Sequence, residues 1–331
     1  MSNMKIEYLS NPFLPIIKDK WKGNIVIDGK FYNTNTPEKS PITKLLKWKF
    51  SANPQKEEKK KDSYKLGVTL IKDLGTIKDR IVWLGHASFL ISIKGVNIII
   101  DPSFFSIPGF ERKVEMPCKI EELNNIDFLL VSHDHRDHFD IKSIKEIIKN
   151  NSKICALIPL RMAQLFKKNK LNSKEIQEAG WYQEYKISKD IRIVFVPSKH
   201  WGRRGVFDFN RVLWGGFIIM YGDKKIFFSG DTSYSDVFKE IHSVFGDMDI
   251  CLLPIGAYSP AFMMKDSHVS PEEAYQIYKD LKAKIFIPMH YGTFDLSDEP
   301  MGEPINRIRD RFKDNVEELV ELAVGGEYSL E

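Results

Sequence analysis

The run VSHDHRDHFD at residues 131–140 constrains the fold of this 331-residue chain more than any other segment. It continues a short apolar run that is typical of a buried strand. Three of the eight histidines lie within six residues here, at His133, His135 and His138, together with Asp137. Imidazole and carboxylate groups are the ligands that ions such as zinc prefer. We therefore interpret the run as a metal-binding turn at a strand end. The alternative, a polar surface loop, is disfavoured because histidine is a rare residue.

Three other apolar runs also end in a residue that can bind a metal. IRIVFVPSK is followed by His200, KIFFSG by Asp231 and KIFIPM by His290. Strand ends of an α/β sheet converge on one crevice, so these residues can join the first cluster. Each alone is weak support, but together they fill a site for two divalent ions, most simply Zn²⁺. The expected ligands are His133, His135 and His200 for one ion, Asp137, His138 and His290 for the other, and Asp231 between them.

The pattern from residue 80 onward predicts an α/β domain with helices outside packed sheets. Strands are expected at 81–84, 89–93, 96–100, 127–131, 155–159, 191–196, 215–220, 225–229, 249–254 and 284–289. Helices are expected at 143–149, 161–168, 235–241, 271–281 and 305–312. Ser270, Pro271 and the two glutamates after them form a strong helix start. The tail AVGGEYSL could pair as an edge strand.

Residues 1–79 differ in texture and are predicted to form a partly irregular N-terminal arm that packs on or caps the domain at 80–331. Prolines interrupt the segment, and its charged run at 56–62 is typical of a solvated loop. The stretch ITKLLKWKF at 42–50 alternates basic with apolar residues. It could form a short amphipathic helix that packs on the core or touches a membrane surface, and we prefer packing.

Composition limits the class of protein. The net charge of +4 is too small to indicate nucleic-acid binding. The three cysteines are far apart and form no CxxC pair, so neither disulfides nor a thiolate zinc site is indicated. No apolar run is long enough to span a membrane, and the N-terminus lacks the pattern of a secretory signal. We expect a cytoplasmic protein, with peripheral membrane contact and a homodimer left open.

Five motifs resemble those of the metallo-β-lactamase fold superfamily: WLGHASFLI with IIIDPSF, SHDHRDHFD, PSKHWGRR, FSGDT and MHYGTF. The resemblance covers about residues 79–300. It narrows to the N-acylphosphatidylethanolamine-hydrolysing phospholipase D group through KHWGRR (199–204), VLWGGF (212–217), LPIGAYSP (253–260) and KDSHVSPEEA (265–274). Histidine rather than glutamate at position 135 resembles the hydrolytic members more than the di-iron redox members.

This resemblance implies a four-layer αββα sandwich with an N-terminal extension and the metal site at one edge of the sheets. The family's metal ligands fall on the seven residues already counted. The implied activity is a zinc-dependent phospholipase D-type phosphodiesterase that acts on N-acyl phosphatidylethanolamine or a related phospholipid. A hydroxide held between the ions would attack phosphorus. Asp137 could also orient the nucleophile, and His268 could bind the phosphate or assist the leaving group, although a surface role for His268 has comparable weight.

Several further residues could surround the site without binding an ion. His86 and Asp101 follow strands and are assigned to supporting the ligands or to turns, because the ligand set is already full. Arg203 and Arg204 could bind a phosphate or headgroup, or be a solvated pair. Tyr258 begins an aromatic and methionine-rich stretch that could line a greasy substrate wall or simply join the core.

Other functions remain open on the same residues. A lactonase similar to ascorbate-6-phosphate lactonase, or another small-molecule metallo-hydrolase, would use the same ions on a different substrate. A non-catalytic binding protein is the alternative from a different class, and we disfavour it because all seven ligands are present. A nuclease is disfavoured by the low net charge.

Overall fold

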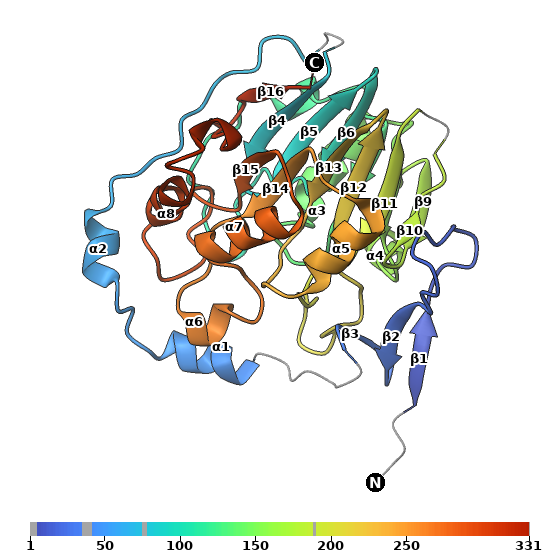
Figure 1. Cartoon of the computed structure of the whole chain (residues 1–331), viewed down its shortest axis with the longest axis horizontal. Coiled ribbons are helices and arrows are strands. Elements are labelled where there is room, and N and C mark those ends of the chain that lie inside the picture. The colour runs from blue at the N-terminus through green and yellow to red at the C-terminus, as the bar shows by residue number, and fades with distance from the viewer. Residues whose placement is uncertain (1–4, 35–41, 75–77, 188–189, 331) are drawn as a thin grey trace.

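Two β-sheets packed face to face form the centre of the molecule, with helices outside both (Figure 1). The computed structural model describes residues 5–34, 42–74, 78–187 and 190–330. The first sheet has the order β16-β4-β5-β6-β7-β8-β9 and the second β10-β11-β12-β13-β14-β15. In chain order the first sheet comprises β4 (Arg80–Gly85), β5 (Ser88–Ile93), β6 (Val96–Ile100), β7 (Phe128–Leu130), β8 (Cys155–Pro159), β9 (Glu175–Ala179) and β16 (Glu327–Ser329). The second comprises β10 (Gln183–Glu184), β11 (Arg192–Val196), β12 (Gly216–Tyr221), β13 (Lys224–Phe228), β14 (Ile250–Pro254) and β15 (Ile285–Met289).

The continuous apolar runs arise because both faces of the first sheet are buried. In β5, Phe89 and Ile91 point into the core between the sheets, whereas Leu90 joins the core beneath the outer helices. Successive side chains of a strand point to opposite faces, so a strand covered on both sides cannot alternate apolar with polar residues. The same division holds for Ile98 and Ile99 in β6.

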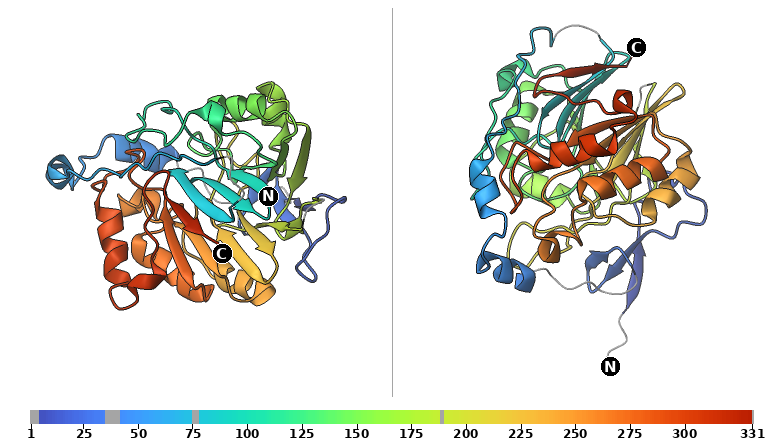
Figure 2. Two further views of the ribbon diagram at one scale, coloured as in Figure 1. Left: turned by 90° about the horizontal axis from the view of Figure 1, so that it is seen from above. Right: turned by 60° about the vertical axis from the view of Figure 1, so that its left-hand side comes forward.

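Helices cover the outer face of each sheet. Helices α3 (Ile141–Asn150) and α4 (Ala163–Lys168) lie on the first sheet, and α5 (Val237–Phe245), α7 (Pro271–Asp280) and α8 (Glu303–Arg311) on the second. Figure 2 shows the two helical layers on opposite sides of the sheets. The predicted start of α7 is confirmed: the Ser270 hydroxyl accepts a hydrogen bond from the Glu273 amide in a capping box. The predicted four-layer αββα sandwich is confirmed.

The strand directions bring the predicted ligand positions to one edge. Strands β6, β7, β8 and β9 pair in parallel, as do β13, β14 and β15, so their carboxyl ends share an edge. The loops that leave these ends are the usual place for a site in an α/β fold. The C-terminal tail pairs as the edge strand β16 beside β4, as expected.

The first part of the chain lies along the core and touches it at many points. A small sheet of β1 (Ile6–Leu9), β2 (Asn24–Ile27) and β3 (Lys30–Tyr32) is tied to the second sheet's edge by a hydrogen bond from the Ile17 amide to the Tyr182 carbonyl, 2.8 Å. Helix α1 (Ile42–Lys49) contacts α6 (Ala261–Met264) and donates a hydrogen bond from Trp48 to Asp298, 3.0 Å. The sequence did not predict β1–β3, because their residues read as irregular and Pro-interrupted.

The solvated loop predicted for the charged run is wrong: α2 (Lys56–Lys61) is helical and has no buried residue. Lysine and glutamate are good helix formers, and here glutamates occupy the first turn and lysines the last, which suits the helix dipole. The Lys59 ammonium pairs with Asp295 at 2.5 Å and holds the helix to the core. Within the part of the chain that the structure describes, no helix has the length and apolar character needed to cross a bilayer.

Candidate metal centre

Five segments from both sheets bring their side chains together at one edge. The first sheet supplies the β4–β5 turn with His86 and the loop after β7 with residues 133–138. The second supplies His200 after β11, Asp231 after β13 and His290 directly after β15. The structure thus brings together all seven residues predicted as ligands, although they span almost 160 positions of sequence.

The first group consists of His133, His135, His200 and Asp231, whose ligand atoms all lie within 4.8 Å of one another. His135 Nδ1 lies 3.0 Å from His133 Nε2 and 3.2 Å from His200 Nε2. Asp231 Oδ2 lies 3.9 Å and 4.0 Å from those two Nε2 atoms. Three imidazole nitrogens and a carboxylate that face one point form a suitable set for a tetrahedral ion.

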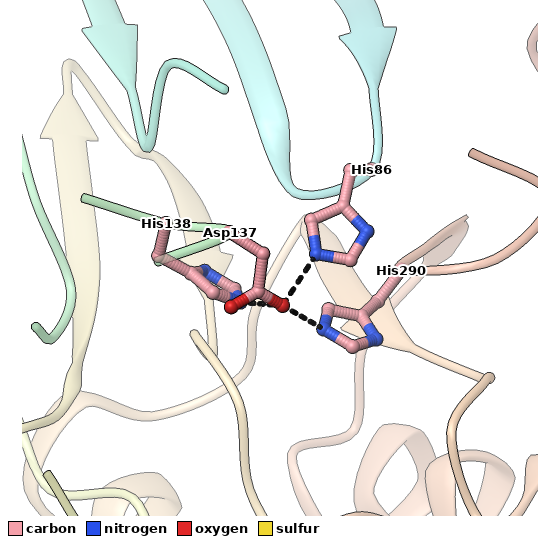
Figure 3. A group of neighbouring side chains, drawn as sticks. All are labelled: His86, Asp137, His138 and His290. Atoms are coloured by element: carbon pink, nitrogen blue, oxygen red, sulfur yellow. Dashed lines mark hydrogen bonds and ion pairs between the residues drawn. The ribbon is translucent and has the colours of Figure 1, made fainter. Parts of the chain in front are cut away.

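The second group consists of His86, Asp137, His138 and His290 (Figure 3). Asp137 Oδ2 lies 3.0 Å from His86 Nε2, 3.6 Å from His290 Nε2 and 3.7 Å from His138 Nε2. Asp231 also reaches this group, because His138 Nε2 and His290 Nε2 each lie 3.2 Å from one of its oxygens. Asp231 therefore stands between the two groups, where the sequence had placed it.

The hydrogen-bond partners fix which imidazole nitrogens carry a lone pair. His200 Nδ1 faces the Ser267 carbonyl at 2.9 Å, so it must donate, and a neutral His200 then presents a lone pair at Nε2. The Ser132 hydroxyl donates to Asp101, so His133 Nδ1 in turn donates to Ser132. Two Nε2 lone pairs consequently face the same point beside a carboxylate. A cation there removes the repulsion among them.

Buried polar atoms without hydrogen bonds lead to the same conclusion. Among the described residues, His138 Nε2, His290 Nε2 and Asp231 Oδ1 are buried and make none. Leaving such atoms unpaired costs free energy, and native proteins rarely do so unless water or an ion completes the contact. The residues therefore fit divalent metal ions.

The charges in the cluster shift several pKa values. Burial would lower the pKa of His290, but the carboxylates of Asp231 and Asp137 raise it to about 9. The pKa of His138 is also raised well above its usual value by Asp231 and Asp137, against the effect of burial. Burial lowers the pKa of His135 to about 4, and the pKa of His133 and His200 is lowered well below its usual value by burial and neighbouring histidines.

The two carboxylates hold their negative charge despite burial. Burial would raise the pKa of Asp137 and of Asp231, but the surrounding histidines, His138 first, hold both well below the usual range. Both carboxylates are therefore ionised, and in the absence of metal the protons that the raised pKa values place on His138 and His290 balance their charge. Divalent cations would take the place of those protons.

His86 and Asp101, predicted to support the ligands, occupy different positions. Asp101 Oδ2 accepts a hydrogen bond from His138 Nδ1 at 2.7 Å and another from Ser132, so it lies one contact behind the ligand atoms. His86 instead points into the second group and hydrogen-bonds Asp137 directly. His86, Asp101 and His290 all adopt a left-handed backbone, with φ of 54°, 43° and 62°. Such conformations are costly for these residues and gather at functional sites.

His268 and Tyr258 lie beside the centre. His268 Nδ1 lies 3.8 Å from Asp231 Oδ2 and has no hydrogen-bond partner among the described residues. Burial lowers the pKa of His268 to about 4. Both residues line a cavity of about 480 Å³ with Ser259, Arg307 and others, and the Tyr258 hydroxyl donates to Glu303 at 2.7 Å. Most residues that line this cavity are polar. Of the two alternatives left open for the stretch that begins at Tyr258, the burial of Tyr258, Met263 and Met264 favours the core.

The two arginines after His200 are engaged in local contacts. The Arg204 guanidinium donates to the carbonyls of Asp134 and Phe139, at 2.8 Å and 2.9 Å, and lies over the Phe139 ring. It braces the 133–138 loop, a role that neither of the two alternatives left open for Arg204, phosphate binding or solvation, had included. Arg203 donates to the Gly205 carbonyl at 2.7 Å and remains partly exposed.

Sequence reasoning missed two residues that hold the site. Arg112 donates to the carbonyls of Leu84 and Ser103, both at 2.7 Å, and so joins the turns that carry His86 and Asp101. Trp201 packs its ring edge-on to His135, with centroids 4.5 Å apart, and donates to Ser267 at 2.8 Å. The position of Trp201 next to His200 was a usable signal, whereas nothing in the sequence links Arg112 to the turns it joins.

Known proteins are similar to this chain in sequence and in fold. Residues 96–291 match the beta-lactamase superfamily domain. The chain is 36% identical over 247 residues to the N-acyl-phosphatidylethanolamine-hydrolyzing phospholipase D 1 of Caenorhabditis elegans, covering 70% of this chain and 68% of that protein. It is 33% identical over 237 residues to the mitochondrial N-acyl-phosphatidylethanolamine-hydrolyzing phospholipase D of Saccharomyces cerevisiae, covering 68% of this chain and 50% of that protein. The chain thus spans only half the length of the yeast relative.

A solved structure extends the likeness to the fold. Igni18, a metallo hydrolase from Ignicoccus hospitalis, superposes with a TM-score of 0.59 at 20% identity, covering 76% of this chain and 98% of that one. At this identity the likeness concerns the fold alone. Together with the matched domain and the two clusters of histidine and aspartate, these likenesses establish that the chain is a metal-dependent hydrolase of the beta-lactamase superfamily, in the group that includes the N-acyl-phosphatidylethanolamine-hydrolysing phospholipases D.

Proposed function

We propose that this protein is a zinc-dependent phosphodiesterase of phospholipase D type, acting on N-acyl phosphatidylethanolamine or a related phospholipid. One observation carries the proposal: two ligand groups meet at Asp231 beside a cavity that His268 lines. Paired divalent ions are the usual solution for hydrolysing phosphodiesters. The activity for which the worm and yeast relatives are named supports the lipid substrate.

The metal-holding roles follow from the contacts. We assign His133, His135 and His200 to one ion, Asp137, His138 and His290 to the other, and Asp231 to both. Five imidazoles and two carboxylates favour zinc over the hard ions that prefer oxygen. Bound ions would lower the pKa of water toward neutrality and offset the charge that develops on the phosphate oxygens.

The chain's own residues would position the reacting groups. The Asp137 carboxylate is fixed by its hydrogen bond from His86, and from there it can orient an attacking water. His268 has a buried ring nitrogen without a partner and faces both Asp231 and the cavity, so it can bind a phosphate oxygen or the leaving oxygen. In the overall reaction, water oxygen bonds to phosphorus and the bond from phosphorus to the N-acylethanolamine oxygen breaks. One proton of the water ends on that oxygen.

The test is turnover of a substrate panel by zinc-loaded protein, with metal content measured on the same preparation. We expect N-acyl phosphatidylethanolamine to give phosphatidic acid and N-acylethanolamine. In water labelled with heavy oxygen, the label should enter phosphatidic acid. Inert phospholipids together with ring opening of a sugar lactone would overturn the proposal in favour of a lactonase. A chain that binds no transition metal and gains no activity on zinc addition would favour a non-catalytic protein.

A further inference from the structure

Large hydrophobic side chains are exposed on three segments near the metal centre. Among the described residues twelve such side chains are exposed, and five of them belong to these segments. Phe50 is 88% exposed and Phe207 91% exposed. Single exposed apolar residues are ordinary, but several on neighbouring segments require an explanation. We name the group the apolar rim; it consists of Leu46, Phe50, Val206, Phe207 and Phe262.

Each part of the apolar rim is tied to the metal centre. Helix α6, which carries Phe262, leads directly to His268, whose amide donates to the Met264 carbonyl at 2.8 Å. The loop that carries Val206 and Phe207 begins at Trp201, beside His200. These segments meet where Trp201 donates to Ser267 at 2.8 Å. Figure 1 shows α1, α6 and the loop between β11 and β12 along the same lower edge.

The third part, α1, is held in a fixed orientation by polar contacts. Its Lys44 ammonium pairs with Asp266, and its Trp48 indole donates to Asp298. These contacts bind one side of the helix to the core and leave Leu46 and the following Phe50 in solvent. The predicted packing of α1 thus accounts for part of the helix only.

The charge around the apolar rim selects one kind of partner. Helix α1 carries Lys44, Lys47 and Lys49 and no acidic residue. The Lys47 ammonium lies 4.8 Å from the centroid of the Phe262 ring, so cationic and apolar groups are interleaved. Lys265 follows α6 directly and is also exposed. Apolar side chains that insert among headgroups, flanked by lysines, are the signature of a surface that binds anionic lipid.

We infer that the apolar rim, together with Lys47 and Lys49 of α1, forms a docking surface for an anionic lipid bilayer, and that docking sets the metal centre against the headgroups. The inference deepens the proposed function, because a substrate embedded in a bilayer must reach the ions without leaving the lipid phase. A partner protein or a second copy of the chain would be the alternative occupant of this surface if vesicles are not bound.

The test is sedimentation of the zinc-loaded protein with vesicles, using phosphatidylcholine alone or mixed with phosphatidylserine. We expect binding that increases with phosphatidylserine and decreases with salt. The double variant Phe50→Ser with Phe207→Ser should reduce vesicle partitioning about tenfold or more, because two aromatic side chains no longer insert. Its turnover of a short-chain, water-soluble phosphodiester should match the unmodified protein.

Val316→Ser is the matched control. Val316 is 67% exposed, but it begins the short helix η2 (Val316–Glu318), which contacts β15, and the following Leu319 pairs with Phe286 near the amino end of that strand, opposite the metal centre. This variant should bind vesicles like the unmodified chain. Binding that is absent in the unmodified chain, or equal in the double variant, would overturn the inference. Self-association that the double variant abolishes without any vesicle binding would assign the surface to a second copy.

Vesicle binding is also measured on Asp231→Ala, which should lack hydrolysis. If Asp231→Ala still binds vesicles, the docking surface acts independently of the metal-dependent reaction. If the unmodified protein binds vesicles through the apolar rim but hydrolyses no phospholipid, the proposed function fails and the docking surface stands.

Discussion

Asp231 is the residue on which both ligand groups depend, since its two oxygens face His138 and His290 at 3.2 Å each and lie within 4.0 Å of His133 and His200. Asp231→Ala should therefore lose at least one of the two expected ions. Turnover should fall by about three orders of magnitude or more, because the ions supply several kcal/mol of barrier lowering. Elemental analysis and initial rates check this. Asp236→Asn, an exposed change five residues further on, is the control and should alter neither quantity.

Asp101 offers a finer test, because it touches no expected ion. Asparagine at this position tolerates the left-handed backbone, and its side-chain oxygen can still accept the hydrogen bond from His138. Its side-chain NH₂ group, however, then faces the backbone N–H of Ser132, and two donors cannot hydrogen-bond each other. We expect Asp101→Asn to lower zinc affinity about 10- to 100-fold, as is usual when the partner of a ligating histidine is lost. Competition with a chromogenic chelator measures it. Unchanged affinity would mean that His138 is oriented by other contacts.

Residue type and strand-end position were enough to select the seven side chains that the structure brings together. Those two signals could not separate His86 from Asp101, since both simply follow strands. The difference depends on where the β4–β5 turn crosses the edge, which places His86 Nε2 3.0 Å from Asp137. Likewise Arg204 looked suited to phosphate, and only the fold shows its guanidinium on the carbonyls of the metal-binding loop.

At the scale of elements, the hydrophobic pattern of the sequence predicted the strands that are buried on both faces and missed elements that are partly exposed. Strands β4 to β7 and β11 to β15 are apolar on both faces, so each was predicted. Strand β9 has the sequence EIQEA and is mostly half-exposed at the sheet edge, and it was missed. Helix α2 was missed because charge alone was taken as a loop signal, although its residues favour a helix.

One edge of the first sheet contains an ion-pair network whose contribution to stability depends on pH. Arg80 on β4 is 2% exposed and pairs with Asp73 at 2.8 Å and with Glu327 on β16 at 2.5 Å. Hydrogen bonds from Arg80 and Lys78 lower the pKa of Asp73 to about 2. A carboxylate whose pKa falls on folding stabilises the fold above its unfolded pKa, and that contribution is lost as pH falls toward the folded value.

Asp73→Asn should accordingly reduce the free energy of unfolding at pH 7 and pH 5. The gap to the unmodified protein should narrow as pH falls from about 3.8 toward about 2. Urea unfolding at several pH values measures the gap. Asp314→Asn, at an exposed position near the C-terminus, should show no such pH-dependent gap. A gap that stays constant down to pH 2 would mean that Asp73 acts through packing and not through its charge.

At the scale of the whole molecule, the metal centre joins the two sheets. His133, His135, Asp137 and His138 come from the first sheet, and His200, Asp231 and His290 from the second. The sequence predicted that these strand ends converge and that helices lie outside packed sheets, whereas the four-layer sandwich was implied by the resemblance to the metallo-β-lactamase fold. The course of residues 5–34 and 42–74 over the core could not be predicted, because single polar contacts such as Trp48 with Asp298 leave no periodic pattern.

Because the ligands come from both sheets, bound ions should act as a clamp between the two layers. Removing them with a chelator should lower the thermal midpoint of the whole chain, since the ions then no longer join ligands from the two sheets. Adding zinc should restore the midpoint. At a free zinc concentration 100 times the dissociation constant, binding adds about 2.7 kcal/mol to the free energy of unfolding. Differential scanning fluorimetry over a zinc titration measures the shift. In Asp231→Ala the shift should be much smaller, since the residue shared by both ligand groups is gone. If the thermal midpoint of the unmodified protein does not change although loss of the metal is verified, packing between the sheets alone determines the stability. The ions would then serve the chemistry only.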